Sequence, residues 1–527
     1  MKKWLAIFLF LSTALYGQIS LKQLQPLKQQ VQQIRKLPFK QNVAVGVKNK
    51  NQLAKYMLQQ LNIALPPAKA RNLAIALRAF GLIEHKTNLR QVLVQFYKHN
   101  TGGFYDPTTK KLFIIQESTH SRGSAVILHE LTHALQDQHF NLYPLQRFFQ
   151  NNDDQSAALS ALVEGDATFT MFYPRIGHNL AAQKNLTRTF QLSAELGKEF
   201  NPATKNVPAI IQDTILFNYS QGLRFAIALH KKGGYRQINQ AFRDPPASTE
   251  QILHPEKYLA AKRDEPVVVK LPPLRAFFPP KKGWRRVLKN TMGELGIQIL
   301  LREHLAYKKL KKLGPLWRLA RKYTLLRGLG RTAMKLWTRK RISQAAAGWG
   351  GDQYAVFHNP RTKQTSLLWY TYWDSPKDAR EFYEIASSIF SRKRTRWVNR
   401  ALLSHKSVIV LLHIPRGVLT NLCSTLVNKT RLQPFSRKRF QTDFPIVEAI
   451  YRLRFLPKKL TVAELEKRQN AILAYAKRAV PYLIQALDAE GHLGFKQEVA
   501  KLLKKLTGKN FGTDFKKWNL WWEEQER

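Results

Sequence analysis

The spacing of hydrophobic and polar residues along this chain predicts a mixture of helices and strands. Apolar residues at helical spacing, or a helix-forming composition, predict helices at residues 20–35, 50–62, 124–140, 156–172, 375–391 and 464–506. Short apolar runs predict strands at residues 43–47, 353–357, 366–373 and 407–415. The stretch TGGFYDPTTKKLFII at 101–115 has two strand-like runs around an Asp-Pro turn, so we expect a β-hairpin there. The whole pattern predicts the α+β class.

The length and the cysteine content limit how this chain can be stabilised. A chain of 527 residues is too long for one compact core, so we expect two or three domains. Hydrophobic residues form 44% of the chain, which is enough for folded domains rather than disorder. Because Cys423 is the only cysteine, the chain forms no intramolecular disulfide, and its stability depends on packed cores.

The first residues resemble a targeting signal. Two lysines precede the apolar run WLAIFLFLSTAL at residues 4–15, and small residues follow as possible cleavage points. The run is shorter than the roughly 20 residues that a helix needs to cross a bilayer. We therefore expect a cleaved signal peptide at residues 1–17 and a secreted or periplasmic protein of a bacterial envelope. An uncleaved N-terminal anchor is the alternative.

Positive charge dominates the composition but is unevenly distributed. The chain has 86 Lys and Arg against 35 Asp and Glu, a formal net charge of +51. Residues 304–351 and 385–442 contain no acidic residue. Residues 101–200, in contrast, contain no excess of Lys and Arg over Asp and Glu. These basic segments suit an anionic polymer or a membrane surface. No specific nucleic-acid motif accompanies them, so we favour solvated lysines and arginines as the interpretation.

The stretch HELTHALQDQHF, residues 129–140, is the strongest chemical signal. On a helix, His129 and His133 project from one face about one turn apart, so two imidazole nitrogens can reach the same tetrahedral zinc ion. Glu130 is turned by about 100° from His129, so it can address a water molecule near the metal instead of the metal itself. An apolar lead-in precedes the motif, as a buried active-site helix requires.

A zinc hydrolase needs a third protein ligand, and three residues compete for this role. His139 has the spacing of metzincins, but these proteins need glycine where this chain has Gln136. On a continuous helix, His139 and Asp137 lie roughly 15 and 12 Å along the axis from the first histidine. Glu164 belongs to a separate helical stretch and can approach the metal from across a helix pair, so we select Glu164. Asp137 and Asp166 are candidates for orienting a ligand imidazole, and a plain structural role is an equal alternative for each.

The HExxH motif with a distant glutamate resembles the gluzincin group of zinc peptidases. More narrowly, the chain resembles a poorly characterised bacterial family of secreted gluzincin-like proteins. The stretches that carry the resemblance are GFYDPTTKKLFII at 103–115, HELTHALQDQHF at 129–140, ALVEGDAT at 161–168, DPPASTEQILHPEKY at 244–258, NTMGELG at 290–296, GWGGDQY at 348–354 and LLWYTYWDSPKDAREF at 367–382. The resemblance implies zinc and the hydrolysis of peptide bonds, and it supplies no substrate.

The expected mechanism assigns a role to each part of this motif. Zinc acidifies a water molecule, and Glu130 accepts the proton of that water and passes it to the leaving amine. A further donor should stabilise the tetrahedral oxyanion, and Tyr219 and His254 are candidates. Packing is the simpler interpretation for Tyr219, and turn capping is an equal alternative for His254. The hairpin at 103–115 offers an edge strand along which an extended peptide can pair its backbone, or it is simply part of a sheet core.

Four segments follow from these observations. After the signal peptide, we expect a zincin-like, mostly helical catalytic domain with a small edge sheet at residues 18–340. An α+β module follows at residues 341–455. Residues 456–527 resemble a HEAT-type helical segment with a tryptophan-rich tail, and only one helix pair is evident, which favours a docked cap over an array.

The main alternative to a peptidase is a non-catalytic protein of the cell envelope, or one that binds an anionic polymer, in which the zinc site only supports the structure. Structural zinc sites are usually closed by four ligands and rich in sulfur, and this chain has no cysteine near the motif. We therefore favour a hydrolase that acts on a peptide or protein substrate. The sequence does not reveal the substrate, the cleavage preference, the oligomeric state or an activation step.

Overall fold

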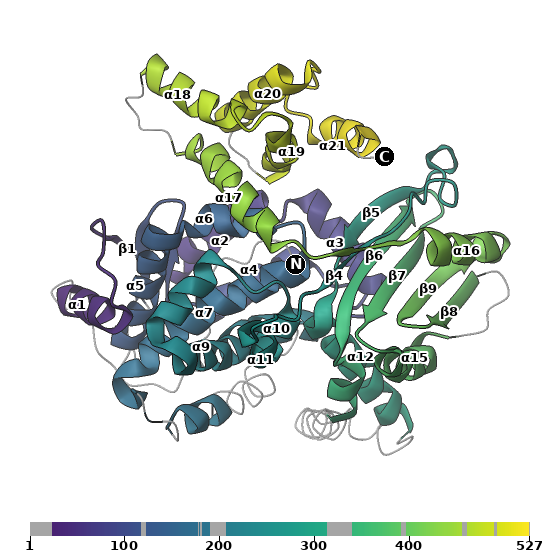
Figure 1. Ribbon diagram of the computed structural model, residues 1–527, viewed down its shortest axis with the longest axis horizontal. Helices are drawn as coiled ribbons and strands as arrows, with labels where there is room; N and C mark the ends of the chain where they lie inside the picture. The colour runs from purple at the N-terminus through teal and green to yellow at the C-terminus, as the bar shows by residue number, and fades with distance from the viewer. Residues whose placement is uncertain are drawn as a thin grey trace.

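The fold is mixed α+β, as the sequence predicts. The structure is a computed structural model and describes residues 24–116, 123–177, 179, 182–189, 207–312, 340–391, 397–455, 461–489 and 493–525. Figure 1 shows a mostly helical body, a sheet with flanking helices, and a group of C-terminal helices. The expected signal peptide lies outside the described residues.

The helical body contains a small three-stranded sheet. Its strand order is β1-β3-β2, with β1 parallel and β2 antiparallel to β3, so β2 lies at one edge. The expected hairpin is therefore present. The elements of the body are α1 (Leu24–Arg35), β1 (Ala44–Lys48), α2 (Lys50–Ala64), α3 (Pro67–Ala79), α4 (Leu89–Asn100), β2 (Gly103–Asp106), β3 (Lys111–Ile115), α5 (Gly123–Phe140), α6 (Leu142–Phe149), α7 (Asp153–Ile176), α9 (Ala209–Arg243), α10 (Thr249–Leu253) and α11 (Pro255–Leu259).

Helix α5 is buried between the small sheet and α7. Its apolar side chains repeat at helical spacing and pack with Tyr105 of β2 and Leu112 of β3 in one core cluster. The buried apolar residues of α5 in this cluster are Ile127, Leu128, Leu131, Ala134 and Leu135. Because these residues face the sheet, the polar residues between them face other elements, including α7.

Helix α7 has a well-defined start, which fixes its register. The side chain of Asn152 caps it by accepting a hydrogen bond from the backbone amide of Gln155 (3.1 Å). Asp153 and Asp154 lie in the first turn, where negative charge is favourable. Most of the following residues are buried, because α7 packs along α9 in the centre of the body.

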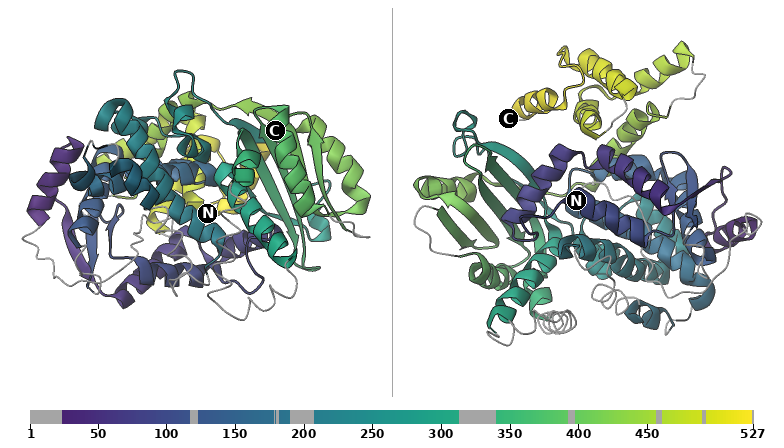
Figure 2. Two further views of the ribbon diagram at one scale, coloured as in Figure 1. Left: turned by 90° about the horizontal axis from the view of Figure 1, so that it is seen from below. Right: turned by 180° about the vertical axis from the view of Figure 1, so that it is seen from behind.

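The second part is a five-stranded antiparallel sheet of order β5-β6-β7-β9-β8. Helix α15 packs on one face, and α16 with the chain after β4 covers the other (Figure 2). Its first strand comes from residues 285–290, ahead of the boundary at residue 341 expected from the sequence. The elements of this part are β4 (Val267–Lys270), β5 (Arg285–Asn290), α12 (Gly293–Lys312), β6 (Trp349–Asn359), β7 (Gln364–Trp373), α15 (Pro376–Phe390), β8 (Trp397–Ser404), β9 (Ser407–Pro415), α16 (Leu419–Lys429) and β10 (Arg431–Pro434), which pairs with β4.

The C-terminal helices form a third cluster with its own core. They are α17 (Arg437–Arg452), α18 (Val462–Leu473), α19 (Val480–Ala489), α20 (Leu493–Thr507) and α21 (Phe515–Gln525). Trp518 is fully buried in this core, so it covers an apolar face of these helices. The core also includes Tyr143 of α6, so these helices dock on the helical body. Among the described helices, none has the length and apolar character needed to cross a membrane.

Candidate metal centre

Helices α5 and α7 bring His129, His133 and Glu164 together, and all three side chains are buried. The distance from Glu164 Oε2 is 3.3 Å to His129 Nε2 and 3.5 Å to His133 Nε2. One ligand atom of each residue lies within 4.8 Å of those of the other two. The group can therefore hold a metal ion.

The two distances suit a tetrahedral metal better than direct hydrogen bonds. Hydrogen bonds between nitrogen and oxygen usually measure about 2.7–3.2 Å, so both contacts are long. Ligands about 2.0–2.1 Å from a tetrahedral zinc ion lie about 3.3 Å apart, which is close to both values. His133 Nε2 is also buried without a hydrogen-bond partner among the described residues. The donor set of two imidazoles and one carboxylate fits zinc.

The charges of the three residues are strongly coupled. Burial raises the pKa of Glu164, but the neighbouring histidines outweigh burial and lower this pKa below its usual range. Burial and the adjacent His133 lower the pKa of His129. Burial lowers the pKa of His133, but the carboxylates of Glu164 and Glu130 outweigh burial and raise this pKa to about 9. Glu164 thus stays ionised and His129 stays neutral, which are the forms that bind metal, whereas a metal ion has to displace a proton from His133.

A buried chain of polar side chains orients His133. Gln136 Oε1 accepts a hydrogen bond from His133 Nδ1 (2.9 Å), so Nε2 is the ring nitrogen that faces Glu164 and is left for a metal ion. The amide nitrogen of Gln136 donates to Asp166 Oδ2 (2.8 Å) and to the carbonyl oxygen of Val163 (3.0 Å). Arg35 of α1 forms an ion pair with Asp166 (3.2 Å). Asp166 thus acts on His133 through Gln136, in place of the direct contact considered from the sequence.

Glu130 is held next to the three residues by the edge strand β2. Its Oε2 accepts a hydrogen bond from the backbone amide of Tyr105 (2.6 Å), whereas its buried Oε1 has no hydrogen-bond partner among the described residues. Gly103 allows this approach, because a β-carbon there would press on the carbonyl oxygen of Phe113 and on Val126. Burial raises the pKa of Glu130 to about 8, so its carboxylate binds a proton more strongly than an exposed glutamate.

Tyr219 of α9 lies beside the same group. Its ring centre is 6.3 Å from that of His129, and the side chain is buried. Burial raises the pKa of the Tyr219 hydroxyl well above its usual value, and the carboxylates of Glu164 and Glu130 raise it further. Burial and the charge of Glu164 also raise the pKa of Tyr97 of α4. The sequence gave no reason to select this tyrosine. Both hydroxyls therefore remain protonated and able to donate.

His254 does not join this group. Its ring nitrogens face Glu294 (3.2 Å) and Glu256 (3.6 Å), and no hydrogen bond or ion pair links it to the three residues above. The sequence-based suggestion that His254 stabilises an oxyanion thus has no support from its contacts. His254 instead connects the start of α11 to α12.

The two rival ligands have other partners. Helix α5 continues through His139, whose Nε2 contacts the carbonyl oxygen of Pro38 (2.8 Å). Asp137 accepts hydrogen bonds from the Tyr105 hydroxyl (2.8 Å) and the Leu142 amide (3.1 Å), so it joins β2 and α6 to α5. Neither residue lies in the group of possible metal ligands.

A second acidic cluster contains Glu250, Asp264 and Asp374. The ammonium group of Lys257 lies among the three carboxylates, at 2.6, 2.6 and 3.2 Å. This lysine supplies the positive charge that a metal ion would bring, so we assign the cluster a structural role.

Comparison with known proteins gives one match. Residues 283–410, which include the strands of the five-stranded sheet except the last part of β9, match a family model described as a domain of unknown function (DUF8575). No curated protein matches the chain significantly. No solved structure does so either. The matched segment excludes the residues of the metal centre.

Proposed function

We propose that this protein is a gluzincin-type zinc peptidase in which His129, His133 and Glu164 hold the metal. The observation that supports this most is the pair of 3.3 and 3.5 Å distances from Glu164 to the two imidazoles, next to a buried carboxylate that does not belong to the ligand set. Structural zinc sites rarely place a free proton acceptor beside the metal, whereas hydrolytic sites require one.

Each residue has a separate task in the proposed reaction. A bound zinc ion supplies a Lewis acid that acidifies water and polarises the scissile carbonyl group. Glu130 Oε1 accepts the proton of the attacking water, while the Tyr105 amide holds Oε2 in place. The protonated Glu130 then delivers this proton to the leaving amine. The Tyr219 hydroxyl is our candidate for a donor to the developing oxyanion.

The edge strand β2 limits how a substrate approaches. Hydrogen bonds to β3 use alternate residues of β2, and the Tyr105 amide points away from β3, towards Glu130. The Tyr105 amide is therefore not available for a hydrogen bond to a substrate. A peptide that pairs with β2 would have to use the neighbouring outward groups, such as those of Gly103.

We also propose that the reaction takes place outside the cytoplasm, because residues 1–17 have the pattern of a cleaved signal peptide. Residues 313–339 of the first basic segment and 392–396 of the second lie outside the described residues, and the role of these segments at an anionic surface stays a prediction from the sequence.

The experiment compares the mature wild-type protein with Glu130→Gln, each loaded with zinc, on an unfolded protein substrate. We expect the wild type to cleave and Glu130→Gln to lose at least about 99% of the rate, because a general base contributes roughly 10²–10⁴-fold. Equal zinc content in both proteins is the control. A zinc-loaded wild type that cleaves no member of a broad peptide library would contradict the proposal and favour a non-catalytic zinc protein.

A further inference from the structure

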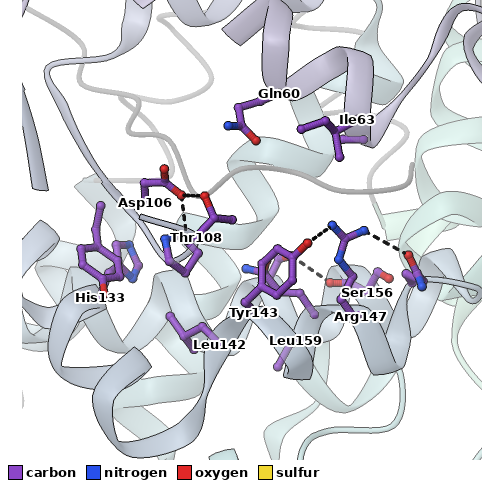
Figure 3. Close-up of a pocket in the computed structure, with 16 residues that line it drawn as sticks. Gln60, Ile63, Asp106, Thr108, His133, Leu142, Tyr143, Arg147, Ser156 and Leu159 are labelled. Carbon is purple, nitrogen blue, oxygen red and sulfur yellow. Dashed lines mark hydrogen bonds between the residues drawn. The ribbon is translucent and has the colours of Figure 1, made fainter. Parts of the chain in front are cut away.

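A cavity of about 90 Å³ lies directly beside the metal centre. His133 forms part of its wall, together with residues of the hairpin turn after β2 and of α2, α6 and α7. Figure 3 shows His133 at one side of the group of lining side chains and Arg147 at the other. The cavity has room for several water molecules or for one small polar group of a ligand.

The guanidinium group of Arg147 is fixed in the wall of this cavity. The side chain is 5% exposed, and its guanidinium carbon lies 4.6 Å from the ring centre of Tyr143 and 5.6 Å from that of Tyr451. It also donates to the Tyr143 hydroxyl and, at 3.5 Å, to Gln150 Oε1. Such contacts orient a guanidinium group before a ligand arrives, which lowers the entropy cost of binding.

Arg147 is the group in the wall that an anion can bind. Among the described lining residues, Asp106 is the only acid. Both of its oxygens already accept hydrogen bonds, from the amide and hydroxyl of Thr108 and from the hydroxyl of Thr109 (2.8, 2.6 and 2.8 Å). The carboxylate of Asp106 is therefore held in the hairpin turn, and Arg147 is the one Arg or Lys among the described lining residues.

We propose that this cavity, which we name the carboxylate pocket, binds a carboxylate group of the peptide substrate through Arg147. The inference rests on the proposed peptidase function, because that function places a peptide beside His133. The planar guanidinium group matches the two oxygens of a carboxylate. The carboxylate is either the free C-terminus of the peptide or an acidic side chain next to the cleaved bond.

The C-terminal helices take part in this pocket. Tyr451 of α17 stacks against the guanidinium group, and its ring contacts that of Tyr143 edge-on at 5.5 Å. Gln485 of α19 donates a hydrogen bond to the backbone carbonyl of Arg147 (2.9 Å). The full chain is therefore the proper material for the test.

The test uses one peptide sequence in three forms: a free C-terminus, a C-terminal amide, and an amide with glutamate replacing the residue after the cleaved bond. The wild type should prefer one carboxylate form over the plain amide by roughly tenfold to hundredfold in kcat/KM, as expected for a hydrogen bond to a charged group. A preference for the free C-terminus identifies a carboxypeptidase, and a preference for glutamate identifies an acidic side chain. No preference overturns the inference.

Variants connect the preference to Arg147. We expect Arg147→Met to lose it and Arg147→Lys to keep part of it. The control is Arg286→Met, because Arg286 of β5 pairs with Glu523 (2.6 Å) and does not line the pocket. The preference of this variant should equal that of the wild type. A preference that persists in Arg147→Met overturns the inference. If thermal unfolding shows that Arg147→Met does not fold, the carboxylate preference of Arg147→Lys is compared with that of the wild type. An undiminished preference in Arg147→Lys, or no preference in the wild type, would count against the inference.

A binding measurement separates this inference from the peptidase proposal. Zinc-loaded Glu130→Gln is titrated calorimetrically with the same three peptides. Tighter binding of a carboxylate form supports the pocket even if the wild type cleaves nothing, in which case only the peptidase proposal fails. Cleavage by the wild type without any carboxylate preference in rate or in binding leaves the peptidase proposal standing and overturns the pocket.

Discussion

Gly165 of α7 and Gly222 of α9 meet where the two helices cross. A β-carbon on Gly165 would overlap the carbonyl oxygen of Gly222, and one on Gly222 would overlap that of Ala161. The close approach matters for the metal centre, because Glu164 precedes one of these glycines and Tyr219 lies almost one turn before the other. Two residues without side chains thus bring a proposed metal ligand and a candidate hydrogen-bond donor to the same place.

Replacing Gly222 with alanine should force α7 and α9 apart. We expect the free energy of unfolding to fall by about 1–3 kcal/mol, as for other overpacked sites, and zinc affinity to weaken as Glu164 moves. Chemical denaturation and a competitive zinc titration measure the two effects. The matched control is Gly417→Ala, where a new β-carbon has no neighbour within 4 Å and should change stability by less than about 0.5 kcal/mol. Equal stability of the two variants would argue against the role of the crossing.

The orientation of His133 by Gln136 makes a second prediction. Gln136→Met keeps the shape of the side chain but removes the acceptor for His133 Nδ1, so the zinc dissociation constant should rise about 10–100-fold. Gln138→Met is the control, since Gln138 lies on the same helix but contacts the backbone amides of Lys40 and Gln41. Identical zinc affinities for both variants would show that Gln136 does not position the ligand.

Tyr219 tests the proposed oxyanion donor. Tyr219→Phe retains the ring beside His129 and removes only the hydroxyl, so zinc content should stay at the wild-type value. If the hydroxyl stabilises the transition state, kcat should fall by about 10²-fold with little change in KM. An unchanged kcat would leave Tyr219 with a packing role, which is the simpler interpretation from its sequence context.

His254 should affect stability in a pH-dependent manner. The hydrogen bond to Glu294 raises the pKa of His254 in the folded state, although burial opposes this. Glu256 also raises this pKa, and the nearby Lys257 lowers it. The stabilisation is therefore complete below the unfolded pKa of about 6.5 and disappears as the pH rises through the folded pKa.

The measurement compares the wild type with His254→Gln, both zinc-loaded, at pH 6 and pH 9. The difference in the free energy of unfolding should be larger at pH 6 by about 1 kcal/mol, the usual contribution of a hydrogen bond. A difference that does not vary with pH would mean that the charged form of His254 adds nothing to stability.

The sequence predicts the parts of the site that depend on local spacing. Helical periodicity predicts the relative positions of His129, Glu130 and His133. Glu164 lies in an apolar helical stretch, where an exposed side chain is unfavourable. The structure brings the three expected ligands together. The hairpin and helix α5 after it also follow from local patterns, whereas helix α4 before it was not predicted.

The remaining parts depend on packing between distant segments, which a single sequence does not display. Nothing near Arg35 signals that α1 reaches Asp166, and nothing in α6 signals that Arg147 enters a cavity beside His133. Strand β5 escaped prediction because it lies at a sheet edge and buries only Val287 and Asn290. An edge strand that is half exposed lacks the apolar run that identifies a central strand.

The measurement that tests the central claim most directly is the zinc content of the wild type, Glu130→Gln and Glu164→Ala after stripping with a chelator and reloading. We predict about one zinc ion per chain in the wild type and in Glu130→Gln, and much weaker binding in Glu164→Ala, because three protein ligands hold the metal and Glu130 is not one of them. A wild type that binds no zinc, or a Glu164→Ala variant that binds it as tightly as the wild type, would contradict the assignment of the metal centre.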